Sequence, residues 1–301
     1  MEKRKILIDC DGGADALVAL LYALRCPELE VIGVTTVAGV CSAEQAAELV
    51  GRTLTLAGHA DIPYASGSET PLVRQPMTAR FGQKMDFLSA GKTAPSPENG
   101  PDMIRTVVRT NPGEVTLVAL GPLTNLARAL LAEYTLAGKI REIVCMGGAF
   151  AYGNSTPKAE FNVYSDPHAA RFVFESPIPV RLVTLDAVRT GALEEDEIRS
   201  ALSDTPLARI LGRAWDGQHC KEELSGRRSL CDLGAMLTLL HPEVFRMQEC
   251  WTDVVLSGGC TLGQSIFDVT GVSGHPANVS VALDVDREAY QVALRAALGS
   301  L

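Results

Sequence analysis

The chain has 301 residues, 47% of them hydrophobic and 21% charged, which is typical of a globular protein. Its formal net charge of -9 opposes binding to nucleic acid or to an anionic membrane surface. A chain of this length buries enough apolar surface to fold without disulfides or structural metals.

Short apolar, β-branched runs alternate with helical patterns along the chain. Strands are predicted at residues 5–10, 29–37, 114–120, 140–146, 180–185 and 278–286. Helices are predicted at residues 14–25, 43–56, 124–132, 166–174 and 287–298. This alternation predicts one α/β domain over residues 1–301, with a mostly parallel central sheet flanked by helices on both faces. Ligands of such sheets bind beyond the carboxyl ends of the strands.

Two segments interrupt this pattern. Residues 69–99 are rich in Pro, Gly, Lys and Arg and have weak periodicity, so we expect a surface loop or lid there. Residues 217–228 form a second charged, glycine-containing stretch of similar character. The chain shows no internal repeat or linker, which favours the single domain.

The eight cysteines form no CxxC pair and no Cys/His spacing that fits a zinc site. Cys10 and Cys145 lie in strand-like runs, and Cys26 ends a helix-like run. We therefore expect buried, reduced thiols in a cytoplasmic protein. We expect neither a signal peptide nor a membrane-spanning segment, because no uncharged run is long enough.

Three carboxylates lie where the first predicted strand gives way to a helix: Asp9, Asp11 and Asp15. Asp9 and Asp11 are two residues apart on an extended segment and so point the same way. Gly12 and Gly13 allow a tight turn, which brings Asp15 into the first helical turn. A single such Asp would be explained by helix capping, but three in seven residues favour an oxygen-rich site for Ca²⁺ or Mg²⁺.

This carboxylate motif is similar to two enzyme families. Asp9-Cys10-Asp11-Gly12 resembles the opening of haloacid-dehalogenase-type phosphatases, in which the first Asp attacks phosphorus. That resemblance covers only a few residues, and the chain has Gly13 and Ala14 where those enzymes have a hydroxyl residue.

The second resemblance, to the nucleoside hydrolases (inosine-uridine preferring), extends across the chain. Residues 9–16 resemble a variant of that family's opening motif, Asp-x-Asp-Pro-Gly-x-Asp-Asp. Further matches follow in order: Val-Thr-Thr-Val-Ala-Gly at 34–39, Leu-Gly-Pro-Leu-Thr-Asn-Leu-Ala at 120–127, Met-Gly-Gly-Ala-Phe at 146–150, Gly-Asn-Ser-Thr-Pro at 153–157, Ala-Glu-Phe-Asn at 159–162, Asp-Pro at 166–167 and Cys-Asp at 231–232. Several collinear matches are far more specific than any one of them. The resemblance implies a nucleoside hydrolase fold with a Rossmann-like core.

The resemblance also implies an activity: hydrolysis of the N-glycosidic bond of a ribonucleoside by water that a bound Ca²⁺ activates. Asp11 would then be metal ligand and general base, Asp15 would bind a ribose hydroxyl, and Asp9 would support the cluster. The remaining implied roles are metal and ribose binding by Asp232, metal binding by the Leu120 carbonyl, and sugar binding by Asn154, Glu160 and Asn162.

The chain departs from the family pattern at several positions. Ala16 stands where the motif ends in a metal-binding Asp, and Val40 where an Asn is usual. Cys231 replaces a His that helps to protonate some leaving bases, and Arg189 and Phe81 also stand at His positions. Losing one carboxylate removes ligands and charge from a Ca²⁺ site, so we expect weaker metal binding.

Three hypotheses follow. The first is a nucleoside hydrolase with altered metal affinity and base preference; the second is a non-catalytic relative that binds ribose-containing ligands. The third is a phosphatase that uses Asp9. The resemblance also implies a homo-dimer or homo-tetramer acting on a small nucleoside, with no nucleic-acid or membrane partner.

Overall fold

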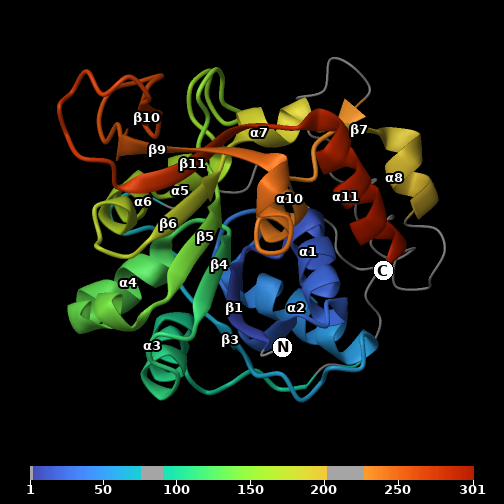
Figure 1. The fold of residues 1–301 in the computed structure, drawn as a ribbon. Coiled ribbons are helices and arrows are strands. Elements are labelled where there is room, and N and C mark those ends of the chain that lie inside the picture. The colour runs from blue at the N-terminus through green and yellow to red at the C-terminus, as the bar shows by residue number, and fades with distance from the viewer. Residues whose placement is uncertain (1–2, 76–90, 92, 202–226) are drawn as a thin grey trace.

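The structure is a computed structural model that describes residues 3–75, 91, 93–201 and 227–301. A nine-stranded sheet runs through it in the order β10-β9-β11-β6-β5-β4-β1-β2-β3 (Figure 1). Neighbouring strands from β11 to β3 are parallel, whereas β9 pairs antiparallel with β11 and β10. The large, mostly parallel sheet confirms the predicted α/β architecture.

The strands of the central sheet are β1 (Arg4–Cys10), β2 (Leu29–Thr36), β3 (Tyr64–Ser66), β4 (Thr116–Leu120), β5 (Glu142–Met146), β6 (Val180–Val183), β9 (Phe245–Val254), β10 (Ser265–Asp268) and β11 (Val279–Val285). A separate two-stranded sheet pairs β7 (Leu193–Glu194) with β8 (Arg227–Arg228). The helices are α1 (Ala14–Arg25), α2 (Ala43–Leu56), α3 (Gly100–Thr110), α4 (Thr124–Ala132), α5 (Phe161–Ser165), α6 (Pro167–Phe174), α7 (Leu185–Thr190), α8 (Glu195–Ala201), α10 (Cys231–Leu237) and α11 (Arg287–Gly299). Two 3₁₀ helices, η1 (Tyr134–Lys139) and η2 (Pro242–Val244), complete the described elements.

Helices cover both faces of the sheet. Successive strand residues point to opposite faces, so one strand contributes side chains to two separate core clusters. In β1, Ile6 and Ile8 join a core cluster with residues of α1, α2, α10 and α11, whereas Leu7 joins a second cluster with α3, α4 and α6. Figure 1 shows these two helix groups on opposite sides of the strands. A strand buried on both faces reads as a continuous apolar run, as Ile6-Leu7-Ile8 does.

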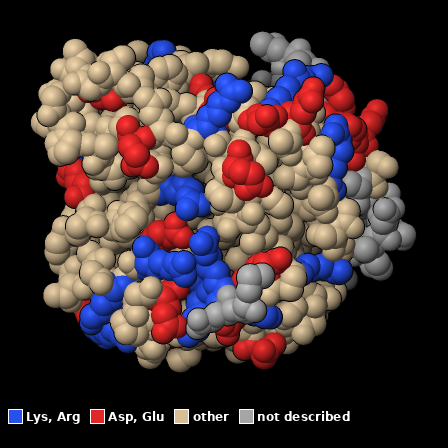
Figure 2. All heavy atoms as spheres, viewed as in Figure 1, with Lys and Arg blue, Asp and Glu red and all other residues tan. Residues whose placement is uncertain are grey.

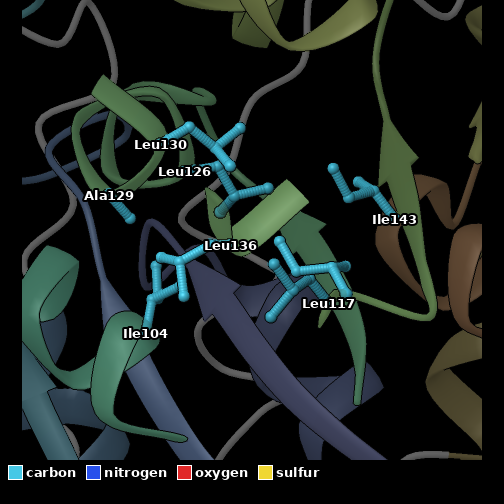
Figure 3. A pocket seen from close by; sticks show the side chains of 8 residues that line it. Ile104, Leu117, Leu126, Ala129, Leu130, Leu136 and Ile143 are labelled. Carbon is cyan, nitrogen blue, oxygen red and sulfur yellow. The ribbon is translucent and has the colours of Figure 1, made fainter. Parts of the chain in front are cut away.

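The second cluster is packed tightly. Figure 3 shows aliphatic side chains from α3, α4, η1, β4 and β5 converging, among them Ile104, Leu117, Leu126 and Leu136. The space between them has no room for a water molecule, and its lining is entirely apolar. This region is therefore part of the core, since a binding site for a small molecule also needs a few polar groups.

The chain changes direction across the sheet between β1 and β4. From β1 it proceeds outward through β2 and β3, and from β4 it proceeds the other way through β5 and β6. Cys10 pairs with both Thr36 and Leu120, so the carboxyl ends of β1, β2 and β4 are level. Such a topological switch point is where open α/β sheets bind ligands.

Most element predictions are confirmed. Helices 14–25, 43–56 and 124–132 have the predicted bounds, and the predicted strands differ from the observed ones by one or two residues at their ends. The described part of residues 69–99 contains no helix or strand, as expected, while residues 76–90 and 92 lie outside the described residues.

Other elements were missed or misassigned. Residues 227–228 were assigned to a loop, but they form β8, which pairs with β7; residues 217–226 and the loop assignment for them lie outside the described part. The sequence did not predict α3 or the hairpin of β9 and β10. The helix α3 begins at an Asn99 cap inside the segment read as Pro- and Gly-rich, and this obscured its start.

The described surface carries acidic and basic side chains, and the described helices are short. No helix among the described residues is both long and apolar enough to cross a bilayer. Figure 2 shows acidic and basic side chains side by side on one face of the molecule.

Candidate active site

The predicted site residues gather around the carboxyl ends of β1, β4 and β5. Asp11 directly follows β1, and Leu120 ends β4 opposite Cys10. Asp232 lies in the first turn of α10, which packs against α1 and β5. The carboxylates of Asp11, Asp15, Asp232 and Glu160 lie close enough to influence one another's ionisation. The fold thus brings together side chains separated by more than two hundred residues in the sequence.

Asp9 is buried within the sheet and held by two neighbours. Its Oδ1 accepts hydrogen bonds from Thr35 Oγ1 at 2.6 Å and Asn125 Nδ2 at 2.7 Å. Burial raises its pKa to about 7, against the opposing effect of those two hydrogen bonds. Its Oδ2 is buried and has no partner among the described residues. Burial and these bonds oppose use of Asp9 as a nucleophile and agree with a supporting role.

Asp11 is held by backbone groups from two loops. Its Oδ1 accepts from Gly13 N at 3.1 Å and its Oδ2 from Val40 N at 3.0 Å. Burial raises its pKa to about 6, and the two backbone N–H groups limit that rise. Each carboxylate oxygen retains a lone pair for a further donor, so the side chain can still accept a proton or bind a cation.

Close backbone packing determines where Asp11 lies. Gly12 has a positive φ of 76°, which favours glycine, and a Cβ there would lie 2.8 Å from Ala46. A Cβ on Gly39 would lie 2.5 Å from Oδ2 of Asp11. Gly12 therefore allows α2 to pack against the turn after β1, and Gly39 allows the loop after β2 to approach the carboxylate.

Asp15 joins α1 to α10. Its Oδ2 accepts from the backbone N of Asp232 at 2.7 Å, at the N-terminus of α10, where helical N–H groups lack intrahelical partners. Helix capping was the alternative to a ligand site for a single Asp in this motif. Asp15 does cap a helix, but that helix is α10 and not α1, in which Asp15 itself lies. The Oδ1 atom is buried without a partner among the described residues, and burial raises the Asp15 pKa to about 7.

Asp232 is a buried carboxylate close to three other acids. Burial raises its pKa well above the ordinary value, and the charges of Asp15, Asp11 and Glu160 raise it further. Several acids in one buried place cannot all be ionised without a positive charge nearby. This arrangement favours a cationic ligand or a cationic transition state.

Glu160 and Asn162 border the site at the end of β5. Glu160 caps α5, since its carboxylate accepts from Asn162 N at 2.9 Å, Val163 N at 3.1 Å and Gly148 N at 3.1 Å. These three N–H groups supply the partners that a buried carboxylate needs. Asn162 Nδ2 donates to Met146 O at 3.1 Å, whereas Asn154 is exposed on the preceding loop.

The departures from the family motif have distinct surroundings. Ala16 is fully buried among apolar residues of the core. Val40 contacts Asp11 through its backbone, so the loss of an Asn side chain does not remove that contact. Cys231 is half-buried at the start of α10, and Phe81 lies outside the described residues.

Sequence reasoning missed the contribution of Asn125. Its Nδ2 donates to both Asp9 Oδ1 and Thr36 O, and its Oδ1 accepts from Ser68 N at 2.8 Å. Asn125 thus links the ends of β1 and β2 to the loop that starts at Gly67. The available signal was its place in the run at 120–127 that matches the family, at the start of the predicted helix after β4.

The donors at this site suit a hard divalent cation, but they form an incomplete shell. Carboxylates and carbonyls are the ligands that Ca²⁺ prefers, and Asp15 offers a buried oxygen without a partner among the described residues. Within the described ranges, however, no three His, Cys, Asp or Glu side chains are arranged to hold a metal by themselves. The site therefore fits a cation held by few protein ligands.

Comparison with known proteins agrees with this geometry. A sequence profile described as inosine-uridine preferring nucleoside hydrolase matches residues 6–292. The chain is 39% identical to the pyrimidine-specific ribonucleoside hydrolase RihA of Klebsiella pneumoniae over 295 residues, covering 95% of each protein. A RihA from a Shewanella species is 35% identical over 298 residues, covering 95% of this chain and 93% of that protein.

Solved structures resemble the whole fold. The plant nucleoside hydrolase PpNRh1 superposes with a TM-score of 0.90 at 30% identity, covering 99% of both chains. A purine-preferring ribonucleoside hydrolase from Gardnerella vaginalis gives a TM-score of 0.86 at 25% identity, covering 98% of both chains. The chain therefore belongs to the nucleoside hydrolase family, whose enzymes hydrolyse ribonucleosides to ribose and a free base.

Proposed function

We propose that the carboxylates at the end of β1 carry out hydrolysis of a ribonucleoside, with Asp11 as general base. The observation that supports this most is the convergence of Asp11, Asp15, Asp232 and Glu160 at the switch point of the sheet. Glycosidic hydrolysis develops positive charge on the sugar ring, which buried carboxylates stabilise more in the transition state than in the substrate.

In this mechanism a water oxygen bonds to the anomeric carbon of ribose, and the carbon–nitrogen bond breaks. The electron pair of that bond leaves with the base, and Asp11 accepts a proton from the attacking water. A pKa of about 6 in the folded protein leaves Asp11 mostly ionised at neutral pH and able to accept it. The departing base takes up a proton, and we assign no residue to that step because Cys231 stands at the position of the family His.

The sugar would be held by groups already oriented by the fold. Asp15 Oδ1 offers an acceptor to a ribose hydroxyl, while Oδ2 is fixed by Asp232 N. Asp232, Glu160, Asn162 and Asn154 complete the proposed sugar contacts. Because Glu160 and Asn162 are themselves hydrogen-bonded to the end of β5, the sugar would meet a prearranged surface.

Nucleoside hydrolases are generally metal-dependent. We propose that Asp11, Asp232 and the Leu120 carbonyl hold Ca²⁺ here, with weaker affinity because Ala16 supplies no carboxylate. The bound cation would lower the pKa of a water molecule and bind ribose hydroxyls.

Ala16→Asp tests this account of the metal. If the missing ligand alone weakens the site, the variant should bind Ca²⁺ at least about tenfold more tightly by calorimetry. Because Ala16 is buried in an apolar cluster, the metal-free variant should also melt earlier, and Ca²⁺ should reverse that loss. Ala16→Ser provides a small polar control without a charge. Unchanged Ca²⁺ affinity in Ala16→Asp would contradict the assignment.

We propose pyrimidine ribonucleosides as the substrates, because the RihA relatives are named pyrimidine-specific. The direct test incubates the protein with uridine, cytidine and inosine in millimolar Ca²⁺ and measures free ribose. We expect release from uridine and cytidine above that from inosine. Release from inosine alone would overturn the substrate proposal, and no release from any of the three would overturn the hydrolase activity.

A non-catalytic ribose-binding protein is the second candidate, favoured by the buried methyl group of Ala16. It predicts that the same nucleosides raise the melting temperature without releasing ribose. No such stabilisation would exclude it.

A further inference from the structure

The loop between β5 and α5, residues 147–159, carries Asn154 and emerges at the edge of the proposed sugar site. Phe150 and Tyr152 on this loop are 51% and 59% exposed, so burial of their side chains does little to hold the loop. Hydrogen bonds to its backbone hold residues 150–156.

Two side chains of α7 hold the first half of this loop. The Asp186 carboxylate accepts hydrogen bonds from Phe150 N at 2.6 Å and Ala151 N at 2.9 Å. Arg189 donates from Nη1 to Tyr152 O at 2.6 Å and from Nη2 to Gly153 O at 3.3 Å. Asp186 and Arg189 are three residues apart and so share one face of the helix.

The chemistry of the two anchors is complementary. A carboxylate only accepts hydrogen bonds and takes the loop's N–H groups, whereas a guanidinium only donates and takes its carbonyls. The Arg189 guanidinium also lies 4.3 Å from the centre of the Tyr152 ring. Four consecutive loop residues, 150–153, thus each have a backbone group bonded to α7.

The second half of the loop is held from the other end. The backbone N–H groups of Asn154, Ser155 and Thr156 donate to the carbonyl of Ala159, which is fully buried. At Gly153 the approach is so close that a Cβ would lie 2.2 Å from Ala159 O. Asn154 therefore follows Gly153, whose carbonyl accepts a hydrogen bond from Arg189, and it begins the turn whose N–H groups donate to Ala159 O.

We infer that Arg189, together with Asp186, is a positioning residue that sets the place of Asn154 at the sugar site. Arg189 acts through the loop and does not itself contact the substrate. This inference rests on the proposed function in one respect, because it assumes that Asn154 contacts the sugar. The hold on the loop itself follows from the contacts alone.

The test is a double-mutant cycle of Arg189→Ala and Asn154→Ala, read as kcat/KM for uridine. We expect Arg189→Ala to lower kcat/KM about tenfold in the wild-type background, mostly through KM, and less than about twofold in Asn154→Ala. Arg189→Lys should recover only part of the loss, since one ammonium lacks the planar fork that spans two carbonyls. Arg171→Ala, which removes an arginine paired with Glu175 and Asp253, is the matched control and should leave kcat/KM unchanged.

Equal losses from Arg189→Ala in both backgrounds would overturn the inference, as would an Asn154→Ala variant with wild-type kcat/KM. Amide hydrogen exchange separates this failure from failure of the proposed function. Arg189→Ala, but not Arg171→Ala, should speed exchange at residues 150–154 even in a protein that releases no ribose. Unchanged exchange there would contradict the hold on the loop, whatever the activity.

Discussion

The carboxylate of Asp11 accepts hydrogen bonds from two backbone N–H groups, one in the turn after β1 and one in the loop after β2. The loop after β2 can approach the carboxylate this closely because Gly39 has no side chain there. Asp11 differs in this from Asp9, whose partners are side chains inside the sheet. The two acids, two residues apart in the sequence, therefore have different surroundings. Asp9 is enclosed by side chains of the sheet, whereas each carboxylate oxygen of Asp11 can accept a further hydrogen bond.

Gly39→Ala tests the dependence of Asp11 on this approach. The new methyl group would lie within 3 Å of the Asp11 side chain, which must move. We expect kcat/KM to fall by about 10²-fold, because misplacing a catalytic group by about 1 Å has that effect. Gly138→Ala is the matched control, since a Cβ there meets nothing within 4 Å. Wild-type kcat/KM in Gly39→Ala would contradict this account of the loop.

At the scale of elements, the longer helices were predicted reliably from the sequence. The helices 14–25 and 43–56 were predicted with their observed bounds, and α2 begins at a Ser42 capping box that marks its start. The short strand β3 and the helix α5 were not predicted, because three to five residues are too few to show a period.

The site was predictable where the residues themselves carry the chemistry, as with Asp11 and Asp232. It was not predictable where a side chain acts by joining elements. Asn125 joins β1, β2 and the loop at Ser68, and Asp186 and Arg189 join α7 to the loop at 150–153. These partners are brought together only by the order of the strands, which local sequence does not encode.

Asn125→Ala tests whether this junction stabilises the fold. The variant removes three hydrogen bonds and leaves Asp9 with Thr35 as its donor, so we expect a loss of about 2–4 kcal/mol in the free energy of unfolding. Asn111→Ala, at the exposed end of α3, should cost less than about 1 kcal/mol. Denaturant unfolding of both variants measures the difference, and equal losses would show that burial of the Asn125 contacts adds no stability.

At the scale of the whole molecule, four buried acids lie at one edge of the sheet in a chain of net charge -9. Their raised pKa values mean that the folded chain holds protons which the unfolded chain releases. Without a cation, the contribution of these groups to the free energy of unfolding therefore falls as the pH rises from about 4 to about 7.

The homo-dimer or homo-tetramer that the family resemblance implies stays a prediction. Light scattering can measure the mass of the particle in solution and so test it.

The dependence of stability on pH and Ca²⁺ follows from the raised pKa values of the buried acids. The proposed Ca²⁺ would bind the ionised carboxylates, and the pKa values of Asp11 and Asp15 are raised to about 6 and about 7. Ca²⁺ should therefore raise the melting temperature by several degrees at about pH 8 and by much less at about pH 5. Sodium chloride at equal ionic strength is the control. An equal effect of Ca²⁺ at both pH values would contradict binding at these acids.

The central claim is that Asp11 performs the chemistry, and Asp11→Asn tests it most directly. The amide keeps the shape of the side chain but cannot accept the proton of water, so kcat for uridine should fall by about 10²–10⁴-fold. Asp61→Asn, at an exposed position, should keep the wild-type kcat. Full turnover by a folded Asp11→Asn variant would contradict the account.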